Sequence, residues 1–220
     1  MLMTDTEIEA AISSGDLMID PMHRPSLQGA SYDARVGGRA LVGGTEADID
    51  VAKAGAVTIR PGEFILLVTR EKFKLSQAVA GHLGMRSYYT RKGFIVLAGL
   101  QVDPGFDGHL VIGGYNASPR SLTLDYEAPF LTVEFHRLGG NAERRFPAGT
   151  EQQQGRIPRA DKDYLRMMET QSLSDIDRGL SELARLVGAV QTDLRYYYLP
   201  LLFATFVAVV AFGLVKLFVR

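Results

Sequence analysis

The sequence predicts a mainly β globular domain over residues 1–160, a heptad helical stalk over residues 161–197 and a transmembrane anchor over residues 198–220. Three patterns support this architecture: short apolar runs broken by glycine and proline, apolar residues at heptad spacing, and an almost wholly apolar end of the chain. The chain has no cysteine and a formal net charge of −1. Disulfides and thiolate metal sites are therefore excluded, and the charge balance favours no nucleic-acid partner.

One helix is expected ahead of the strands. Thr4 and Glu7 stand at capping-box spacing, Ile8 and Ala11 share a helical face, and Gly15 suits the left-handed residue that ends a helix. The same segment carries acidic side chains and no basic one, so it lacks the positively charged start of a secretory signal. We therefore expect the globular domain to be cytoplasmic.

Apolar runs of strand length, with turn residues between them, fill the region that follows. They are Phe64–Val68, Phe94–Leu97, Leu110–Ile112 and Pro129–Phe135. Glycine and proline recur between these runs, which favours short strands over long helices. The domain is therefore expected to be mainly β.

After residue 160 glycine becomes rarer, and apolar residues recur in alternating steps of three and four. The repeating positions are Leu173, Ile176, Leu180, Leu183, Val187, Val190, Leu194 and Tyr197. Heptad spacing keeps these side chains on one stripe of a helix, which must be buried against partner helices. The stalk therefore predicts self-association, and a single amphipathic helix lying on the globular domain is the alternative.

The end of the chain predicts a single membrane span. Leu199–Val219 is interrupted only by Lys216, whose side chain can snorkel to the interface. At 1.5 Å per residue the segment reaches roughly 30 Å, the thickness of a bilayer's hydrocarbon core. Tyr196–Tyr198 precede it and are typical of an interfacial aromatic belt. We expect a single-pass C-terminal anchor, with a buried core helix as the alternative.

The densest group of polar residues lies between residues 81 and 116. Met85–Arg91 carries two guanidinium groups and hydroxyls, and the turn Val102–Gly108 carries carboxylates. Arginine forks match phosphate oxygens and serine adds a donor, so these segments suit a phosphate-and-sugar site. By spacing alone, a solvated turn with surface arginines is the alternative.

These segments resemble the central block of the dCTP deaminase and dUTPase superfamily, and further motifs match in the family's order. The matching segments are Ile19–Pro21, Pro25–Leu27, Ala30–Gly37, Arg60–Phe64, Arg86–Arg91, Asp103–Gly108, Tyr115–Asn116 and Gln152–Gly155. The resemblance covers residues 1–158. It implies a dUTPase-like distorted β-barrel or jelly roll, usually a homotrimer with active sites shared between neighbouring subunits.

The resemblance also implies roles for individual residues toward a deoxypyrimidine triphosphate, dUTP or dCTP. Arg86 and Ser87 would contact the triphosphate, and Arg91 would help to frame the nucleotide. Asp103 would meet the deoxyribose and an active-site water, which makes it the expected catalytic residue. Phe106 would pack near the sugar.

In a dUTPase-like reaction, Asp103 would orient water for attack on the α-phosphate. Magnesium, bound through the nucleotide phosphates, would be the cofactor and would stabilise charge on the phosphoryl oxygens. Gln153 and Gln154 would belong to a mobile arm that closes over the nucleotide and excludes water.

The chain departs from the deaminase pattern at one chemical position. The family's glutamate, which moves protons between water and the cytosine amino group, is replaced by Gly113. Loss of a positioned acid/base group costs about a hundred- to ten-thousand-fold in rate. Met85 and Tyr88 also replace smaller residues of the arginine motif. Diphosphohydrolysis is thus expected ahead of deamination.

Two functions stay open at the level of sequence. One is a membrane-tethered enzyme that acts on a deoxypyrimidine triphosphate. The other is a catalytically silent sensor whose nucleotide occupancy is signalled through the stalk to the membrane helix. The histidines lie far apart in the sequence without metal-ligand spacing, so we expect no metal held by side chains; they are His23, His82, His109 and His136.

Overall fold

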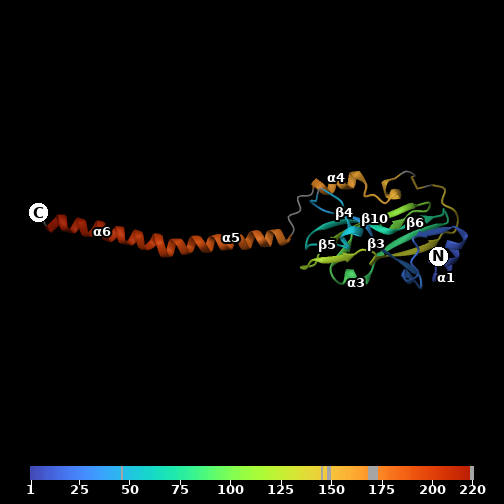
Figure 1. Cartoon of the computed structure of the whole chain (residues 1–220), viewed down its shortest axis with the longest axis horizontal. Helices are drawn as coiled ribbons and strands as arrows, with labels where there is room; N and C mark the ends of the chain where they lie inside the picture. Colours follow the sequence, from blue (N-terminus) through green and yellow to red (C-terminus); the bar gives the residue numbers. More distant parts are fainter. Residues whose placement is uncertain (46, 145, 148–149, 168–172, 219–220) are drawn as a thin grey trace. The chain divides into compact units, whose positions relative to one another are not determined.

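The computed structural model describes residues 1–45, 47–144, 146–147, 150–167 and 173–218 (Figure 1). It separates the chain into two compact units, Met1–Ser172 and Leu173–Arg220. The division falls after the boundary that the composition predicts at residue 160, because a short helix beyond that point still packs on the first unit.

The first unit is mainly β, as the apolar runs predict. Its strands are β1 (Leu17–Asp20), β2 (Leu27–Gln28), β3 (Ser31–Val42), β4 (Ile49–Asp50), β5 (Ala56–Ile59), β6 (Phe64–Leu75), β7 (Val79–Met85), β8 (Phe94–Val96), β9 (Gln101–Val102), β10 (Asp107–Asn116), β11 (Leu122–Asp125) and β12 (Pro129–Arg137). Its helical segments are α1 (Asp5–Ser14), η1 (Arg24–Ser26), α2 (Val51–Ala54), α3 (Ser87–Thr90), η2 (Glu151–Gln154) and α4 (Arg159–Met167).

The strands form a curled half-barrel. Within the described residues, antiparallel pairing runs in the order β8-β10-β6-β3-β12-β7-β9, and β11 pairs with β5 in a second small sheet. Large apolar side chains from many strands close the interior, among them Tyr32, Phe73, Phe94, Phe130 and Phe135, each under 2% exposed. The expected barrel-like, mainly β fold is confirmed.

The predicted N-terminal helix is confirmed as α1. Thr4 accepts a hydrogen bond from the Glu7 amide, and Glu7 accepts one from the Thr4 amide, so the capping box is complete. Gly15 ends the helix at φ 79°. Ile8 and Ala11 are fully buried and fasten α1 to the core.

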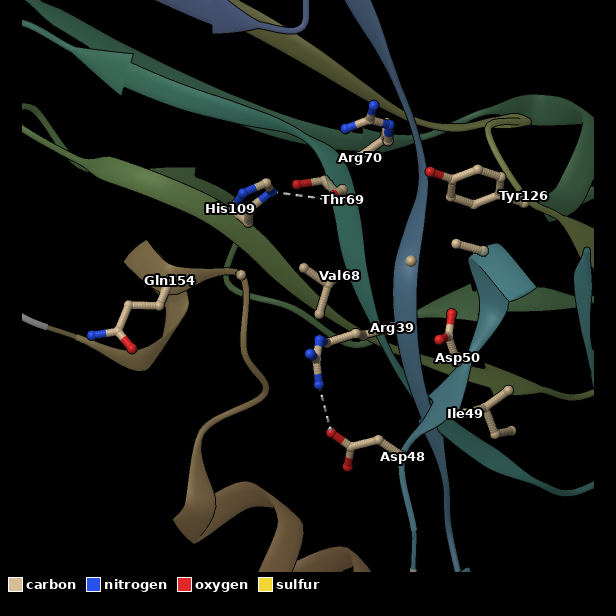
Figure 2. Close-up of a pocket in the computed structure, with 13 residues that line it drawn as sticks. Arg39, Asp48, Ile49, Asp50, Val68, Thr69, Arg70, His109, Tyr126 and Gln154 are labelled. Atoms are coloured by element: carbon tan, nitrogen blue, oxygen red, sulfur yellow. Dashed lines mark hydrogen bonds and ion pairs between the residues drawn. The ribbon is translucent and has the colours of Figure 1, made fainter. Parts of the chain in front are cut away.

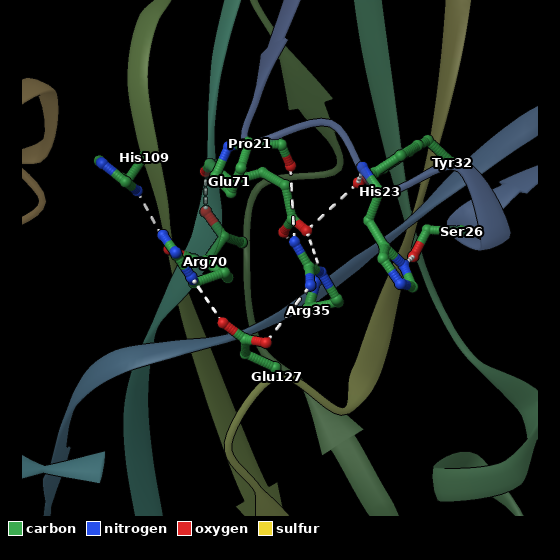
Figure 3. Close-up of polar contacts among 10 residues, drawn as sticks. Pro21, His23, Ser26, Tyr32, Arg35, Arg70, Glu71, His109 and Glu127 are labelled. Carbon is green, nitrogen blue, oxygen red and sulfur yellow. Dashed lines mark hydrogen bonds and ion pairs between the residues drawn. The ribbon is translucent and has the colours of Figure 1, made fainter. Parts of the chain in front are cut away.

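One ion pair lies buried between β3 and β6. Glu71 is 0% exposed, and its Oε1 accepts from Arg35 Nε at 2.6 Å while its Oε2 accepts from the Arg35 amide at 2.8 Å. The Tyr32 hydroxyl donates to Oε1 at 3.3 Å (Figure 3). Arg35 also donates to the Pro21 carbonyl, and its guanidinium lies 3.6 Å from Glu127. One carboxylate therefore ties together two central strands.

The segment after residue 155 returns to the first unit. Ile157 and Leu165 are 1% and 2% exposed, and they cluster with Leu41, Leu66 and Val68. Lys162 supports this docking with an ion pair to Asp48 at 2.6 Å. The helix α4 is therefore amphipathic and belongs to the globular domain, whereas the sequence places it in the stalk.

The second unit is helical throughout its described residues. It comprises α5 (Leu173–Asp193), a π-helical turn (Leu194–Tyr198) and α6 (Leu199–Phe218). The heptad side chains described from Ile176 onward are 45–69% exposed in the single chain. The side chains of Leu173 and Lys216 lie outside the described residues. Within the described part of the chain, one helix, Arg178–Ala211, is long and apolar enough to cross a membrane.

Candidate functional site

A turn between β9 and β10 places Asp103 and Phe106. Gly105 adopts φ 79°, and the Asp103 carbonyl accepts from the Phe106 amide at 3.1 Å. Only glycine takes this left-handed conformation freely. The turn exposes the Asp103 carboxylate and buries the Phe106 ring, which packs edge-to-face on Phe146 at 5.1 Å.

Both residues line a pocket of about 180 Å³, which we call the Asp103 pocket. Most of its lining residues are apolar and come from β7, the β8–β9 loop, β9 and β10; they include Leu83, Ala98, Gly99, Val102, Leu110, Val111 and Ile112. The polar side chains are the Asp103 carboxylate and Gln101, whose amide donates to Asp103 Oδ1 at 2.9 Å. A recess that combines apolar side chains with one anchored carboxylate suits a flat ring with a hydroxyl-bearing sugar.

Arg86 and Ser87 lie elsewhere, where β7 ends and the short helix α3 begins. Arg86 Nε is 3.1 Å from Asp33 Oδ2, and its Nη1 donates to the Pro129 carbonyl at 3.4 Å. The guanidinium is one-third exposed, so one edge of it remains open to a ligand. Ser87 is exposed beside it.

Arg91 is the C-cap residue of α3, and it lines a different pocket. This pocket of about 600 Å³ is lined by three cationic residues, Arg91, Lys92 and Arg120, together with Ser118. The positive charge of these three side chains suits a bound anion. The short helix α3 thus keeps Arg86, Ser87 and Arg91 near the same end of β7.

The arginines and Asp103 lie at opposite ends of β7 within one chain. Val102 pairs with Gly81, whereas Arg86 follows Met85 at the far end of the strand. At about 3.3 Å per residue, Arg86 and Asp103 are separated by roughly 20 Å along the strand direction. One copy of the chain does not bring these predicted site residues together.

The glutamine-rich segment expected to form the mobile arm lies at a third location in the first unit. Gln154 and Gly155 line a pocket of about 430 Å³ with Arg39, Arg70 and His109 (Figure 2). His109 Nδ1 is 3.0 Å from the Thr69 carbonyl oxygen and fixes this wall. The side chain of Gln153 lies outside the described residues. The described residues Gln154 and Gly155 therefore lie beside His109 and are not among the residues that line the Asp103 pocket.

Arg70 lines that third pocket and is paired with Glu127, the neighbour of the lining residue Tyr126. Arg70 Nε donates to Glu127 Oε1 at 3.0 Å, and this hydrogen bond lowers the pKa of Glu127 and raises that of Arg70. Arg39 is 3.8 Å from Asp48. Because each arginine faces a carboxylate, the pocket offers balanced charge instead of a free anion site.

Gly113 occupies a position of β10 with no room for a side chain. A Cβ atom there would lie 2.5 Å from the Leu97 carbonyl oxygen and 3.0 Å from Phe64 Cζ. The Leu97 amide donates to the Gly113 carbonyl at 2.9 Å, so the backbone after β8 is held against the glycine. Glu134 lies on β12 opposite His82 and is not among the residues that line the Asp103 pocket.

The fold also brings together His82, Glu134 and His136, a cluster that the spacing of the histidines in the sequence does not predict. These histidines are far apart in the chain, but the β7–β12 pairing places their rings 4.6 Å apart. The signal available in the sequence was the alternation of Glu134 and His136 on a strand, which places both on one face.

Comparison with known proteins identifies relatives of the first unit. A family model described as dCTP deaminase-like matches residues 2–138. A dCTP deaminase of Thermococcus kodakarensis is 40% identical over 131 residues, which cover 60% of this chain and 83% of that protein. A dCTP deaminase of Pyrococcus furiosus is 39% identical over 146 residues, which cover 66% and 88%.

A solved structure shares the fold at low sequence identity. The 2'-deoxycytidine 5'-triphosphate deaminase from Agrobacterium tumefaciens superposes with a TM-score of 0.52 at 16% identity. The match covers 62% of this chain and 48% of that one, so the chain spans about half the length of that deaminase. The helical second unit lies outside residues 2–138.

The crowding at Gly113 generates a stability prediction. Gly113→Ala is expected to lower the free energy of unfolding by about 1–3 kcal/mol, because its Cβ must displace backbone. Gly99→Ala is the matched control, since a Cβ there meets nothing within 4 Å. It should change stability by less than about 0.5 kcal/mol. Urea unfolding of both variants in detergent, followed by tyrosine near-UV circular dichroism, measures the difference; equal midpoints would contradict the steric account.

Proposed function

Because this chain belongs to the dCTP deaminase-like family, we propose that its globular domain binds a deoxypyrimidine triphosphate, dUTP or dCTP. The observation that carries the proposal is the Asp103 pocket, a recess lined mostly by apolar residues, with one exposed carboxylate that is held by Gln101. Asp103 would meet the deoxyribose, and Phe106 would support the sugar from below. The family match over residues 2–138 includes the lining residues of this pocket except Phe146.

The phosphates would be bound by the α3 turn of a neighbouring copy. Arg86 and Ser87 would contact the triphosphate, and Arg91 would help to frame it from the basic pocket that it shares with Lys92 and Arg120. These groups lie too far from Asp103 in one chain, and Arg86 is already held in place by Asp33. In a site shared between two copies, one chain would supply Arg86 and the other would supply Asp103. The distance between these residues within one chain would then be no obstacle, and Arg86 could stay paired with Asp33.

A homotrimer with three shared sites is the proposed assembly. The stalk supports self-association because its heptad side chains, such as Leu180, Leu183 and Val187, are more than half exposed in the single chain. Water-exposed apolar stripes of this length are stable when partner helices cover them. Gln153 and Gln154 would close over the nucleotide as a mobile arm.

If the site turns over, diphosphohydrolysis is the reaction that its residues support. Asp103 would orient a water molecule for attack on the α-phosphorus, the bond to the bridging oxygen of the β-phosphate would break, and pyrophosphate would leave. Magnesium supplies electrostatic stabilisation of the phosphoryl oxygens when bound. The Asp103 pocket offers a single carboxylate, too few ligands to hold magnesium by itself, which fits an ion that is bound through the nucleotide phosphates.

Deamination would lack a proton-transferring side chain at residue 113, where the deaminases resembled by this chain carry a glutamate. Glycine holds no proton, and the Leu97 carbonyl fills the space that a glutamate at residue 113 would need. This observation also favours a second function, a sensor that binds the nucleotide without converting it. In that case occupancy would be passed through the stalk, which requires two states with different nucleotide affinity.

Membrane attachment through α6 completes the proposal. The 20 residues of α6 span roughly 30 Å at 1.5 Å per residue and carry no charge before Lys216. Tyr196–Tyr198 would lie at the interface, and the globular domain would be cytoplasmic. Anchoring would add to the stalk's association, since tethered chains meet at a high effective concentration.

Turnover by the full chain in detergent distinguishes the reactions. With dUTP or dCTP and magnesium, we expect saturable binding, no ammonia release, and any pyrophosphate release to be abolished by Asp103→Ala. Asp107→Ala is the matched control, because Asp107 pairs with Lys72 and does not line the Asp103 pocket. Ammonia release would contradict the argument from Gly113, and failure to bind either nucleotide would contradict the proposed function.

Mixed assemblies test whether sites are shared. Arg86→Ala and Asp103→Ala should each lose nucleotide binding alone. Co-expressed with different affinity tags and purified through both, they should recover about a third of the sites, because each mixed trimer of two copies of one variant and one of the other contains one site in which both halves are intact. Binding stoichiometry measured by equilibrium dialysis gives the result. If the mixed oligomers bind no more nucleotide than either variant does alone, the site is not shared between chains.

Cell fractionation tests the anchor. The full chain should stay in carbonate-washed membranes, and a chain that ends at Tyr198 should move to the soluble fraction, because it loses the apolar span. Replacement of α6 by an equally long polyleucine helix should restore the membrane fraction and controls for chain length. Retention of the shortened chain in the membrane pellet would overturn the assignment of α6 as the anchor.

A further inference from the structure

The His-Glu-His cluster, defined as His82, Glu134 and His136, lies on the β7–β12 pair. Glu134 is the direct partner of His82 across this antiparallel pair, and His136 is two residues further along β12. Side chains of directly paired residues share a face of the sheet, as do residues two apart on one strand. The backbone alone therefore directs all three side chains to the same side.

The three side chains meet closely enough to hold one ion. Their ligand atoms all lie within 4.8 Å of one another, and His136 Nε2 is 3.7 Å from Glu134 Oε2. Around a tetrahedral ion with bonds of about 2.0–2.1 Å, neighbouring ligand atoms are roughly 3.3 Å apart. Small side-chain rotations would close the remaining gap.

His136 carries a further sign of a missing partner. Its Nε2 atom is buried, and among the described residues it has no hydrogen-bond partner. Leu2 pairs with His136 in an isolated antiparallel bridge, so the backbone at this position is held by the N-terminal segment. A buried imidazole nitrogen without a partner is costly, and a metal ion would satisfy it.

We propose that this cluster binds one divalent transition-metal ion per chain, with Zn²⁺ as the fitting example. Two imidazoles and one carboxylate are a donor set that such ions accept, and they leave a position open for water. Magnesium and calcium prefer oxygen ligands, so the two imidazoles select against them. This site is separate from any magnesium bound through nucleotide phosphates.

The cluster lies one strand away from Asp103. Gln101 on β9 is the partner of His82, and the Gln101 side chain holds the Asp103 carboxylate. An ion at the cluster would fix His82 and with it the strand pair that carries Gln101. The metal site does not rest on the proposed nucleotide binding, because its ligands come from β7 and β12 alone.

Titration calorimetry with Zn²⁺ tests the site on the full chain in detergent, purified without a histidine tag and stripped of metal with EDTA. We expect one Zn²⁺ per chain. His82→Ala and His136→Ala should each weaken binding by at least roughly tenfold, since even loss of an outer-shell partner costs about 10–100-fold. His23→Ala is the matched control, because His23 lies outside the cluster and contacts Ser26; it should bind as the parent chain does.

A second readout keeps the test independent of folding defects. Co²⁺ should give visible ligand-field bands with the parent chain and with His23→Ala, and Glu134→Gln should shift or weaken them while leaving the far-UV circular dichroism unchanged. Zn²⁺ should raise the midpoint of thermal unfolding of the parent and not of the His82→Ala, His136→Ala double variant. Equal Zn²⁺ affinity in the parent and this double variant would overturn the proposal, as would one ion per three chains.

Discussion

The buried carboxylate of Glu71 is the interaction on which the first unit depends. It accepts from two donors of Arg35 and from the Tyr32 hydroxyl, so its charge is matched where water is excluded. Removing one partner of such a pair typically costs about 3–5 kcal/mol, because the other charge is left buried and unpaired. Burial is the main cause that raises the pKa of Tyr32 to about 12, which keeps this hydroxyl a donor throughout the physiological range.

The ion pair between Glu71 and Arg35 also influences the candidate site, because β6 connects the two. Glu71 locks β6 to β3, and β6 in turn pairs with β10 along most of its length. The strand β10 carries one wall of the Asp103 pocket and also Gly113. Since a one-residue slip would reverse the faces of β10, the buried ion pair indirectly fixes which side chains face the pocket.

The chemistry of the pocket is decided by packing as much as by residue identity. A Cβ atom on Gly113 would lie 2.5 Å from the Leu97 carbonyl oxygen, and the Leu97 amide donates to the Gly113 carbonyl. A carboxylate side chain at this position would therefore require the β8–β9 loop to move. By contrast, the far end of β7 keeps its arginines exposed or partly exposed, and the apolar stripe of the stalk is uncovered. Both surfaces suit contact with further copies of the chain.

The mainly β class, the capped N-terminal helix and the long C-terminal helix could all be predicted from the sequence, because capping, short apolar runs and heptad spacing are local properties. The sequence also placed Asp103 and Phe106 on one turn, since Gly105 supplies the conformation that joins them. Tertiary structure alone decided that Leu165 docks on the domain, that Arg86 lies a strand's length from Asp103, and that His82 meets Glu134 and His136. These are contacts between residues distant in sequence, and they depend on strand order and register, which no single segment encodes.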